Sequence, residues 1–220
     1  MKKAEISRLK KLLFYEEKAR LQGFQQIAGV DEVGRGPLAG PVVAACCILP
    51  ANYLLENLND SKQVSVIERE RLYTALSTDP KIQYGVGVVE VVEIDRINIL
   101  QASLFAMQKA VSSLSQPPDY LLVDGNRLPK TDIPGEAVIG GDGKSLSIAA
   151  ASIIAKVTRD RMLERLDEEY PLYGFKKHKG YATPEHLRAI SLYGPCAIHR
   201  TTFEPIKSFC NYSDTPSTRP

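Results

Sequence analysis

The chain has 220 residues, 44% of them hydrophobic and 25% charged, the balance of a globular protein with one large domain or a domain and an appendage. The chain has 28 basic and 26 acidic residues, and a net charge of only +2 does not indicate whether the protein binds nucleic acid. Any basic binding site must therefore come from local clustering of basic residues. The N-terminus lacks an apolar core and the apolar runs are short, so we expect no signal peptide and no membrane span. Four cysteines without a Cys-x-x-Cys pair favour reduced thiols in a cytoplasmic protein, which we take by default as a monomer.

The hydrophobic pattern predicts strands and helices that alternate along the chain. In chain order we expect a helix over 3–23, strands over 27–33 and 41–49, a helix over 65–76, a strand over 82–89, a helix over 95–115, strands over 120–123 and 137–139, and helices over 145–170 and 183–194. The Gly-Arg-Gly-Pro turn at 34–37 joins the first two strands as a hairpin. This order indicates an α/β fold with a mixed sheet and a helical C-terminal portion.

Local signals mark two helix starts and one packing surface. Ser65 and Glu68 have the spacing of a capping box, and Thr183 followed by Pro184 is typical of a helix N-terminus. The first half of the helix over 145–170 is rich in small residues, which predicts close packing on the sheet. We divide the chain into an N-terminal helix (1–23), a core (24–170), a helical portion (171–210) and a flexible tail (211–220).

Four acidic residues occupy positions where a sheet presents a site. Asp31 and Glu32 interrupt the apolar first strand, Asp124 ends the strand over 120–123, and Asp142 lies in a Gly-rich loop. Ligand sites of α/β sheets lie at the ends of central strands. Neighbours in a strand point to opposite faces, so Asp31 and Glu32 share a site only if the backbone twists, which the following glycines allow.

Converging carboxylates are costly unless a cation lies between them, and their oxygens suit Mg²⁺ or Mn²⁺. Two such ions, about 4 Å apart, activate water and stabilise the leaving oxygen in phosphodiester hydrolysis. Taken singly, Asp124-Gly and Asp142-Gly are also ordinary turns. A turn does not explain Asp31 and Glu32 inside an apolar strand, which favours the metal site.

Basic residues cluster near these acids in spite of the modest net charge. The cluster comprises Lys62, Lys144, Lys156, Arg159, Arg161 and the Lys-Lys-His-Lys segment at 176–179. Tyr181 follows Gly180 in this basic loop and suits stacking on a sugar or base, although 176–179 is equally a solvated charged loop. Gly34-Arg35-Gly36 offers close backbone approach and a guanidinium for phosphate, and it is also compatible with a tight turn.

The three histidines do not have the spacing of a zinc site. His178, His186 and His199 match no short ligand pair, so we expect structural or phosphate-facing roles. No P-loop, Gly-x-Ser-x-Gly or Gly-x-Gly-x-x-Gly motif is present, which leaves serine hydrolases and nucleotide folds without support.

Several segments, taken together, resemble bacterial ribonuclease HII. They are IAGVDEVGRGPLAGPVV at 27–43, DSK at 60–62, LLVDGN at 121–126, GGDGKSLSIAAASIIAKVTRDRM at 140–162 and HKGYATPEH at 178–186. The match runs in order from about Phe24 to Phe203. It implies a ribonuclease H-like five-stranded mixed sheet flanked by helices, with a C-terminal helical appendage.

The resemblance also implies an activity and a set of site residues. The family cleaves the RNA strand of RNA–DNA hybrids and incises 5′ to single ribonucleotides in duplex DNA, leaving 3′-hydroxyl and 5′-phosphate ends with Mn²⁺ or Mg²⁺. The implied catalytic, metal-binding acids are Asp31, Glu32, Asp124 and Asp142. The implied substrate contacts are Gly34, Arg35 and Gly36 on the 2′-hydroxyl, Tyr181 on the following deoxyribose, and Lys62, Lys144 and Ser145 on phosphates.

Three alternatives remain for the function. Ribonuclease HIII is similar in fold and acids, but it carries an extra N-terminal domain and lacks the Gly-Arg-Gly and tyrosine pair. A non-catalytic nucleic-acid-binding module would gain nothing from four acids, which repel phosphates. A scaffold protein would tolerate Asp31→Asn or gain stability from it, whereas an enzyme would lose activity.

Overall fold

The computed structural model describes the backbone of residues 1–213, with side chains through residue 210; residues 214–220 of the expected tail lie outside the described residues. Its strands are β1 (Ile27–Val33), β2 (Val42–Ile48), β3 (Gln83–Val89), β4 (Tyr120–Asp124) and β5 (Gly135–Val138). They form one sheet in the order β3-β2-β1-β4-β5. The first three strands are antiparallel, and β4 and β5 run parallel to β1. The predicted hairpin and mixed sheet are therefore confirmed, although β5 begins earlier than expected.

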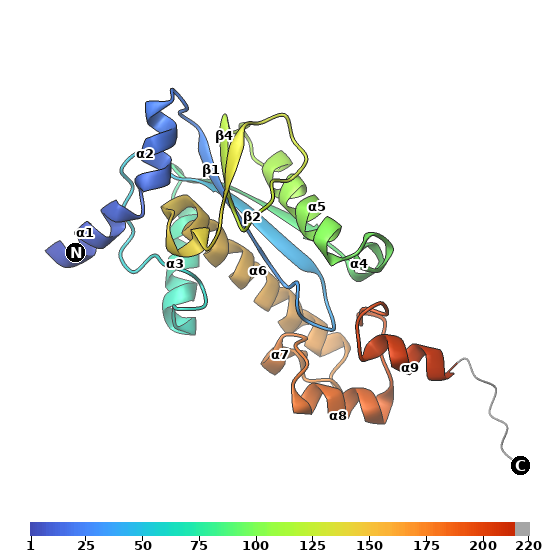
Figure 1. Ribbon diagram of the computed structural model, residues 1–220. Coiled ribbons are helices and arrows are strands. Elements are labelled where there is room, and N and C mark those ends of the chain that lie inside the picture. Colours follow the sequence, from blue (N-terminus) through green and yellow to red (C-terminus); the bar gives the residue numbers. More distant parts are fainter. Residues whose placement is uncertain (214–220) are drawn as a thin grey trace, which may run out of the picture.

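Helices cover both faces of this sheet. They are α1 (Lys3–Lys11), α2 (Phe14–Leu21), α3 (Val66–Thr78), α4 (Val91–Ile97), α5 (Ile99–Ser112), α6 (Leu146–Glu169), α7 (Phe175–His178), α8 (Pro184–Tyr193) and α9 (Ile206–Ser213). Figure 1 shows α6 and α3 on one face, α4 and α5 on the other, and α7 to α9 beyond one end of the sheet. Within the described part of the chain, no helix combines the length and apolar character needed to cross a membrane.

The side chains of β2 alternate between two separate hydrophobic cores, one on each face of the sheet. Cys47 packs in the cluster under α6 and α3, whereas Cys46 packs in the cluster under α5. Adjacent strand residues point to opposite faces, so one fully buried strand serves both layers. The adjacent cysteines therefore face opposite sides of the sheet.

Helix α6 lies unusually close to the central strand β1. A Cβ atom placed on Gly29 would lie 2.0 Å from the backbone carbon of Ser147, so a side chain there would displace the helix. Ala149, Ala150 and Ala151 are fully buried in this layer. The predicted packing of the small-residue half of the helix on the sheet is confirmed.

Two predicted helices are broken in the structure. The helix expected over 3–23 is divided into α1 and α2, and the carbonyl of Leu12 at the break accepts a hydrogen bond from Leu146 N–H, 3.1 Å away. The helix expected over 95–115 begins earlier and is interrupted at Asn98, which has a φ of 68°. The Asn98 side chain caps α5 by accepting from the N–H groups of Leu100 and Gln101. At the first break the substitute for the helical ladder is a tertiary bond from Leu146, and at the second it is the local cap by Asn98.

The predicted helix caps are confirmed, and two further helices appear. Ser65 Oγ accepts from Glu68 N–H at the start of α3, and Thr183 Oγ1 accepts from His186 N–H at the start of α8. The short helix α7 and the helix α9 were not expected. Because α9 extends to Ser213, the tail does not begin at 211 as expected.

Candidate active site

The parallel pairing of β1 and β4 brings two acidic residues to neighbouring strand positions. Val30 of β1 is paired with Val123 of β4, and the next residue on each of these adjacent central strands is an acid, Asp31 on β1 and Asp124 on β4. Asp31 Oδ1 accepts a hydrogen bond from the N–H of Glu32 at 2.8 Å. The register thus places these two predicted site residues on adjacent strands, and their common function stays a prediction.

Asp142 reaches the same place through a short 3-10 helix that follows β5. This element, η1 (Gly141–Gly143), is tied to β4 because Gly141 N–H donates to Asp124 Oδ1 at 2.6 Å. The bond fixes the Gly-rich loop against the end of the strand. Residues of β1, β4 and η1, far apart in the sequence, thereby share one electrostatic environment.

The acids influence one another strongly. Asp31 is 6% exposed, and its pKa is raised well above the usual value by burial and then by the charges of Glu32, Asp124 and Asp142. Burial also raises the pKa of Glu32, which Arg35 partly opposes through an ion pair of 3.2 Å. The site therefore holds more negative charge than its own residues neutralise.

Lys62 and Asp60 complete this charged group. The Nζ atom of Lys62 lies 3.6 Å from Asp142 Oδ2. Burial alone would lower the pKa of Lys62, but Asp142, Asp60, Asp31 and Asp124 together raise it. Burial, Asp124 and Asp60 raise the pKa of Asp142, and a hydrogen bond between the Asp60 and Asp142 side chains contributes. Asp60 was missed as a site residue, although it opens the Asp-Ser-Lys segment.

The donor set fits a divalent cation in chemistry and charge. Carboxylate oxygens are the ligands that Mg²⁺ and Mn²⁺ prefer, and a cation would relieve the repulsion that raises the pKa of Asp31. In the described residues, however, no three His, Cys, Asp or Glu side chains converge tightly enough to hold a metal ion. A metal would thus require the acid side chains to draw closer together.

The Gly-Arg-Gly turn and the predicted stacking tyrosine lie side by side. Gly34 has a φ of 94°, and a Cβ atom there would lie 2.3 Å from Arg159 Nε, so only glycine fits. A Cβ atom on Gly36 would lie 3.7 Å from Tyr181 Cε1. Tyr181 is 43% exposed, which leaves its ring accessible beside the turn. The fold thus brings together two predicted substrate contacts that stand well apart in the sequence.

Two predicted phosphate contacts have other partners. Lys144 is exposed, with Nζ donating to the carbonyl of Ile139 at 2.6 Å. Ser145 is fully buried; its hydroxyl caps α6 and donates to Glu16 Oε1 at 2.6 Å. The prediction that Ser145 contacts a phosphate does not fit this burial. Glu16 was missed, although its i+3 spacing from Leu13 places an acid on the apolar face of the first helices.

Most of the predicted basic cluster is paired within the protein. The ion pairs are Lys156–Asp160 at 2.7 Å, Arg161–Glu70 at 2.6 Å, Lys177–Glu185 at 3.0 Å and Lys179–Glu164 at 2.8 Å. Arg159 is fully buried rather than solvent-facing. Carboxylates of the same fold therefore neutralise four of the charges in the predicted cluster.

The three histidines form a buried network behind Tyr181, which confirms a structural role. His186 Nδ1 donates to the carbonyl of Tyr181 at 2.9 Å, so its Nε2 atom accepts from Nε2 of His199 at 3.0 Å. The Nδ1 atom of His199 in turn accepts from Cys196 N–H at 2.9 Å. Burial lowers the pKa of His186 and of His199 to about 4, so both rings are neutral at pH 7. His178 lies against this pair, with ring centroids of His178 and His186 4.3 Å apart.

The arrangement of the five-stranded mixed sheet and its flanking helices is that of a type 2 ribonuclease H. The chain is similar to the crystal structure of ribonuclease H2 from Pyrococcus horikoshii OT3, with a TM-score of 0.71 and 29% identity, covering 87% of this chain and all of that one. This likeness confirms the ribonuclease H-like fold.

Sequence comparison then gives the family. The family model Ribonuclease HII matches residues 28–206. Ribonuclease HII of Chlamydia muridarum is 54% identical over 193 residues, 88% of each chain. Ribonuclease HII of Bacillus velezensis is 54% identical over 196 residues, 89% of this chain and 76% of that protein. The chain belongs to the ribonuclease HII family, and it is therefore an endonuclease that cleaves the RNA strand of RNA–DNA hybrids.

Proposed function

We propose that this ribonuclease also incises duplex DNA on the 5′ side of a single embedded ribonucleotide, leaving a 3′-hydroxyl and a 5′-phosphate. The observation that carries the proposal is the adjacency of the Gly-Arg-Gly turn and Tyr181, with Gly36 beside the tyrosine ring. A site that recognises one ribonucleotide must sense its 2′-hydroxyl and the DNA that follows it. The turn suits the hydroxyl and the exposed ring suits the next deoxyribose.

Asp31, Glu32, Asp124 and Asp142 are proposed to hold Mg²⁺ or Mn²⁺. Their mutual repulsion, which contributes to the raised pKa of Asp31, supports a cation at this position. Bound divalent ions would supply water activation and stabilisation of the leaving oxygen in phosphodiester hydrolysis. Asp31 is the most buried of these four acids, and, as the resemblance to ribonuclease HII implies, it would be the ligand shared between the ions.

The chain's other residues bind and orient the duplex. Lys62, with a side chain that is 78% exposed, and Lys144 are proposed to contact phosphates beside the acids. Arg35 lies at the rim, where its ion pair with Glu32 can be exchanged for a phosphate. We assign chemistry and these contacts to the core (24–170) and further substrate binding, through Tyr181, to the helical portion (171–210), in a cytoplasmic monomer.

A labelled DNA duplex with one ribonucleotide tests this function, with an all-DNA duplex beside it. Each duplex is incubated with the protein in Mg²⁺, in Mn²⁺ and in EDTA. We expect metal-dependent incision only at the 5′ side of the ribonucleotide. Cleavage of long RNA–DNA hybrids without incision at the single ribonucleotide would overturn the proposal while leaving the family assignment intact.

A further inference from the structure

The turn between β1 and β2 is supported from inside by two buried arginines. Arg159 on α6 and Arg200 in the loop before α9 are both 0% exposed. In the described part of the chain, no carboxylate oxygen lies within 4.0 Å of either guanidinium. Burying a charge without an ionic partner costs free energy, so hydrogen bonds from the guanidinium groups to neighbouring atoms must offset that cost.

Those compensating groups are backbone carbonyls of the turn. Arg200 donates to the carbonyls of Gly34 at 2.6 Å, Arg35 at 3.0 Å and Gly40 at 2.8 Å. Arg159 donates instead to the carbonyls of Pro41, Ala39 and Lys179. Arg159 packs against Gly34, but among the described residues only Arg200, of the two arginines, donates hydrogen bonds to carbonyls of the Gly-Arg-Gly turn.

The carbonyl groups of Gly34 and Arg35 point toward Arg200, so the N–H groups of the same two peptide bonds point away from it. Within the described residues, the N–H groups of Arg35 and Gly36 have no hydrogen-bond acceptor. A guanidinium presents its donors in a rigid planar fork, so it can fix two successive carbonyls at once. The turn therefore presents donors next to the ring of Tyr181, where an oxygen of the substrate would lie.

We propose that Arg200 is a positioning residue for ribose recognition, which holds the Gly34 and Arg35 carbonyls so that the turn presents its backbone to the 2′-hydroxyl. This inference rests on the proposed function and deepens it. Arg200 contacts no reacting atom; it acts through the turn. The guanidinium carbon of Arg200 lies 5.0 Å from the centroid of the Phe203 ring, a cation–π contact that also holds the guanidinium.

The charge on Arg200 persists under working conditions. Burial, and then the nearby charge of Arg159, lowers the pKa of Arg200 to about 9. Burial lowers the pKa of Arg159 to about 10. At neutral pH both guanidinium groups remain protonated, so the hydrogen bonds to the turn are charge-assisted.

The test compares Arg200→Lys with the wild-type protein. Lysine keeps the charge but lacks the fork. Affinity is measured in EDTA by fluorescence anisotropy, for a duplex with one ribonucleotide and for the same all-DNA duplex, and cleavage of the first is measured in Mg²⁺. We expect the wild-type protein to bind the duplex with one ribonucleotide more tightly than the all-DNA duplex. In Arg200→Lys this ratio of affinities should fall about tenfold, which corresponds to about 1.4 kcal/mol. The affinity for the all-DNA duplex should change little.

A matched control separates positioning from loss of stability. Ile190→Ala removes a fully buried apolar side chain of the same C-terminal portion and leaves the donors of Arg200 to the Gly34 and Arg35 carbonyls in place. It should lower the melting temperature and leave the preference unchanged. If Arg200→Lys does not fold, Phe203→Leu, which leaves the guanidinium in place, should reduce the preference in the same direction.

Each outcome has a distinct meaning. A folded Arg200→Lys (or Phe203→Leu) variant that retains the wild-type preference overturns the positioning role alone. Wild-type protein that incises at the ribonucleotide in Mg²⁺ but shows no preference in EDTA also overturns it, while the proposed function stands. Wild-type protein that neither incises nor prefers the ribonucleotide overturns both.

Discussion

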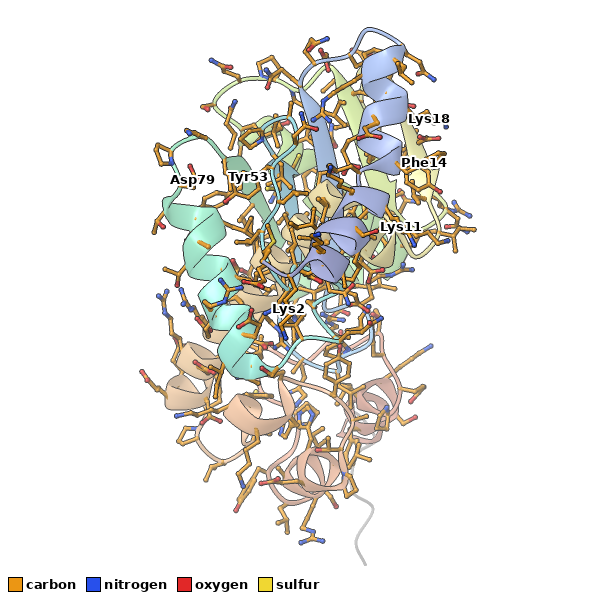
Figure 2. All side chains as sticks on the ribbon, turned by 90° about the vertical axis from the view of Figure 1, so that its left-hand side faces the viewer. Lys2, Lys11, Phe14, Lys18, Tyr53 and Asp79 are labelled. Atoms are coloured by element: carbon orange, nitrogen blue, oxygen red, sulfur yellow. The ribbon has the colours of Figure 1, made fainter. Side chains whose placement is uncertain are left out.

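The Oε1 atom of Glu16 lies 2.6 Å from Ser145 Oγ, and this bond joins the first helices of the chain to the start of α6. The same oxygen accepts from the N–H and the hydroxyl of Ser147. Figure 2 shows these N-terminal helices from outside, with Lys11, Phe14 and Lys18 labelled along their course. Glu16 points inward from α2, next to the loop that carries Asp142.

We expect Glu16→Ala to destabilise the protein by about 1–3 kcal/mol, because the hydroxyls of Ser145 and Ser147 would be left buried without their acceptor. Urea unfolding followed by circular dichroism measures the change. Glu17→Ala is the control, because Glu17 is exposed on the same helix and its loss should cost less than about 0.5 kcal/mol. Equal effects of the two variants would contradict the role of Glu16.

Asp31→Asn should abolish turnover without harming the fold. We expect a loss of more than about a hundredfold in cleavage of an RNA–DNA hybrid, the scale of removing one group that stabilises transition-state charge. In EDTA the melting temperature should stay equal or rise, because burial and three neighbouring acids already raise the pKa of Asp31. Asp132→Asn, an exposed acid of the β4–β5 loop, should change neither quantity. Near-wild-type cleavage by Asp31→Asn would remove this residue from the metal site.

Tyr181→Ala should impair incision at single ribonucleotides more than cleavage of long hybrids, since the ring is proposed to stack at the RNA–DNA junction. Base or sugar stacking contributes about 1–3 kcal/mol, so the affected rate constant should fall about tenfold or more. Tyr193→Ala provides the control, because Tyr193 is similarly exposed at 54% in the same portion. Equal losses on both substrates would exclude junction sensing by Tyr181.

The histidine network predicts that stability falls in mild acid. The pKa of His186 and of His199 is about 4 in the folded protein, against 6.5 for an ordinary histidine. Between pH 6.5 and 4 the unfolded chain binds protons that the folded protein does not, so the free energy of unfolding decreases as the pH falls. Each histidine contributes a slope of up to about 1.4 kcal/mol per pH unit, and the full stabilisation is present above pH 6.5.

Urea unfolding at several pH values measures this slope. The raised pKa of Asp31, Glu32 and Asp142 acts in the opposite direction, because these acids take up protons first in the folded protein. The double substitution His186→Gln, His199→Gln therefore isolates the histidine contribution. Its pH dependence should be flatter than that of wild type across this range. An unchanged slope would show that the network does not resist protonation.

Local patterns in the chain were sufficient for most of the architecture. Alternating apolar residues marked the strands, and Ser65 and Thr183 marked two helix starts, because strand periodicity and helix caps depend on neighbouring residues. The break at Asn98 escaped prediction, since an asparagine with φ of 68° interrupts an otherwise continuous apolar stripe. The acids of the site were recognisable for a related reason: Asp31 and Glu32 are out of place in an apolar strand.

The sequence by itself thus determined the mixed sheet, its order of elements and the acids that stand at its strand ends. Only the tertiary structure decided which charged residues are available to a substrate. Ion pairs such as Arg161–Glu70 and the buried guanidinium of Arg200 join residues widely separated in the chain. Whether a charge is solvated, paired or buried depends on the groups that folding brings within a few ångströms of it. Those distances cannot be read from the spacing of residues in the sequence.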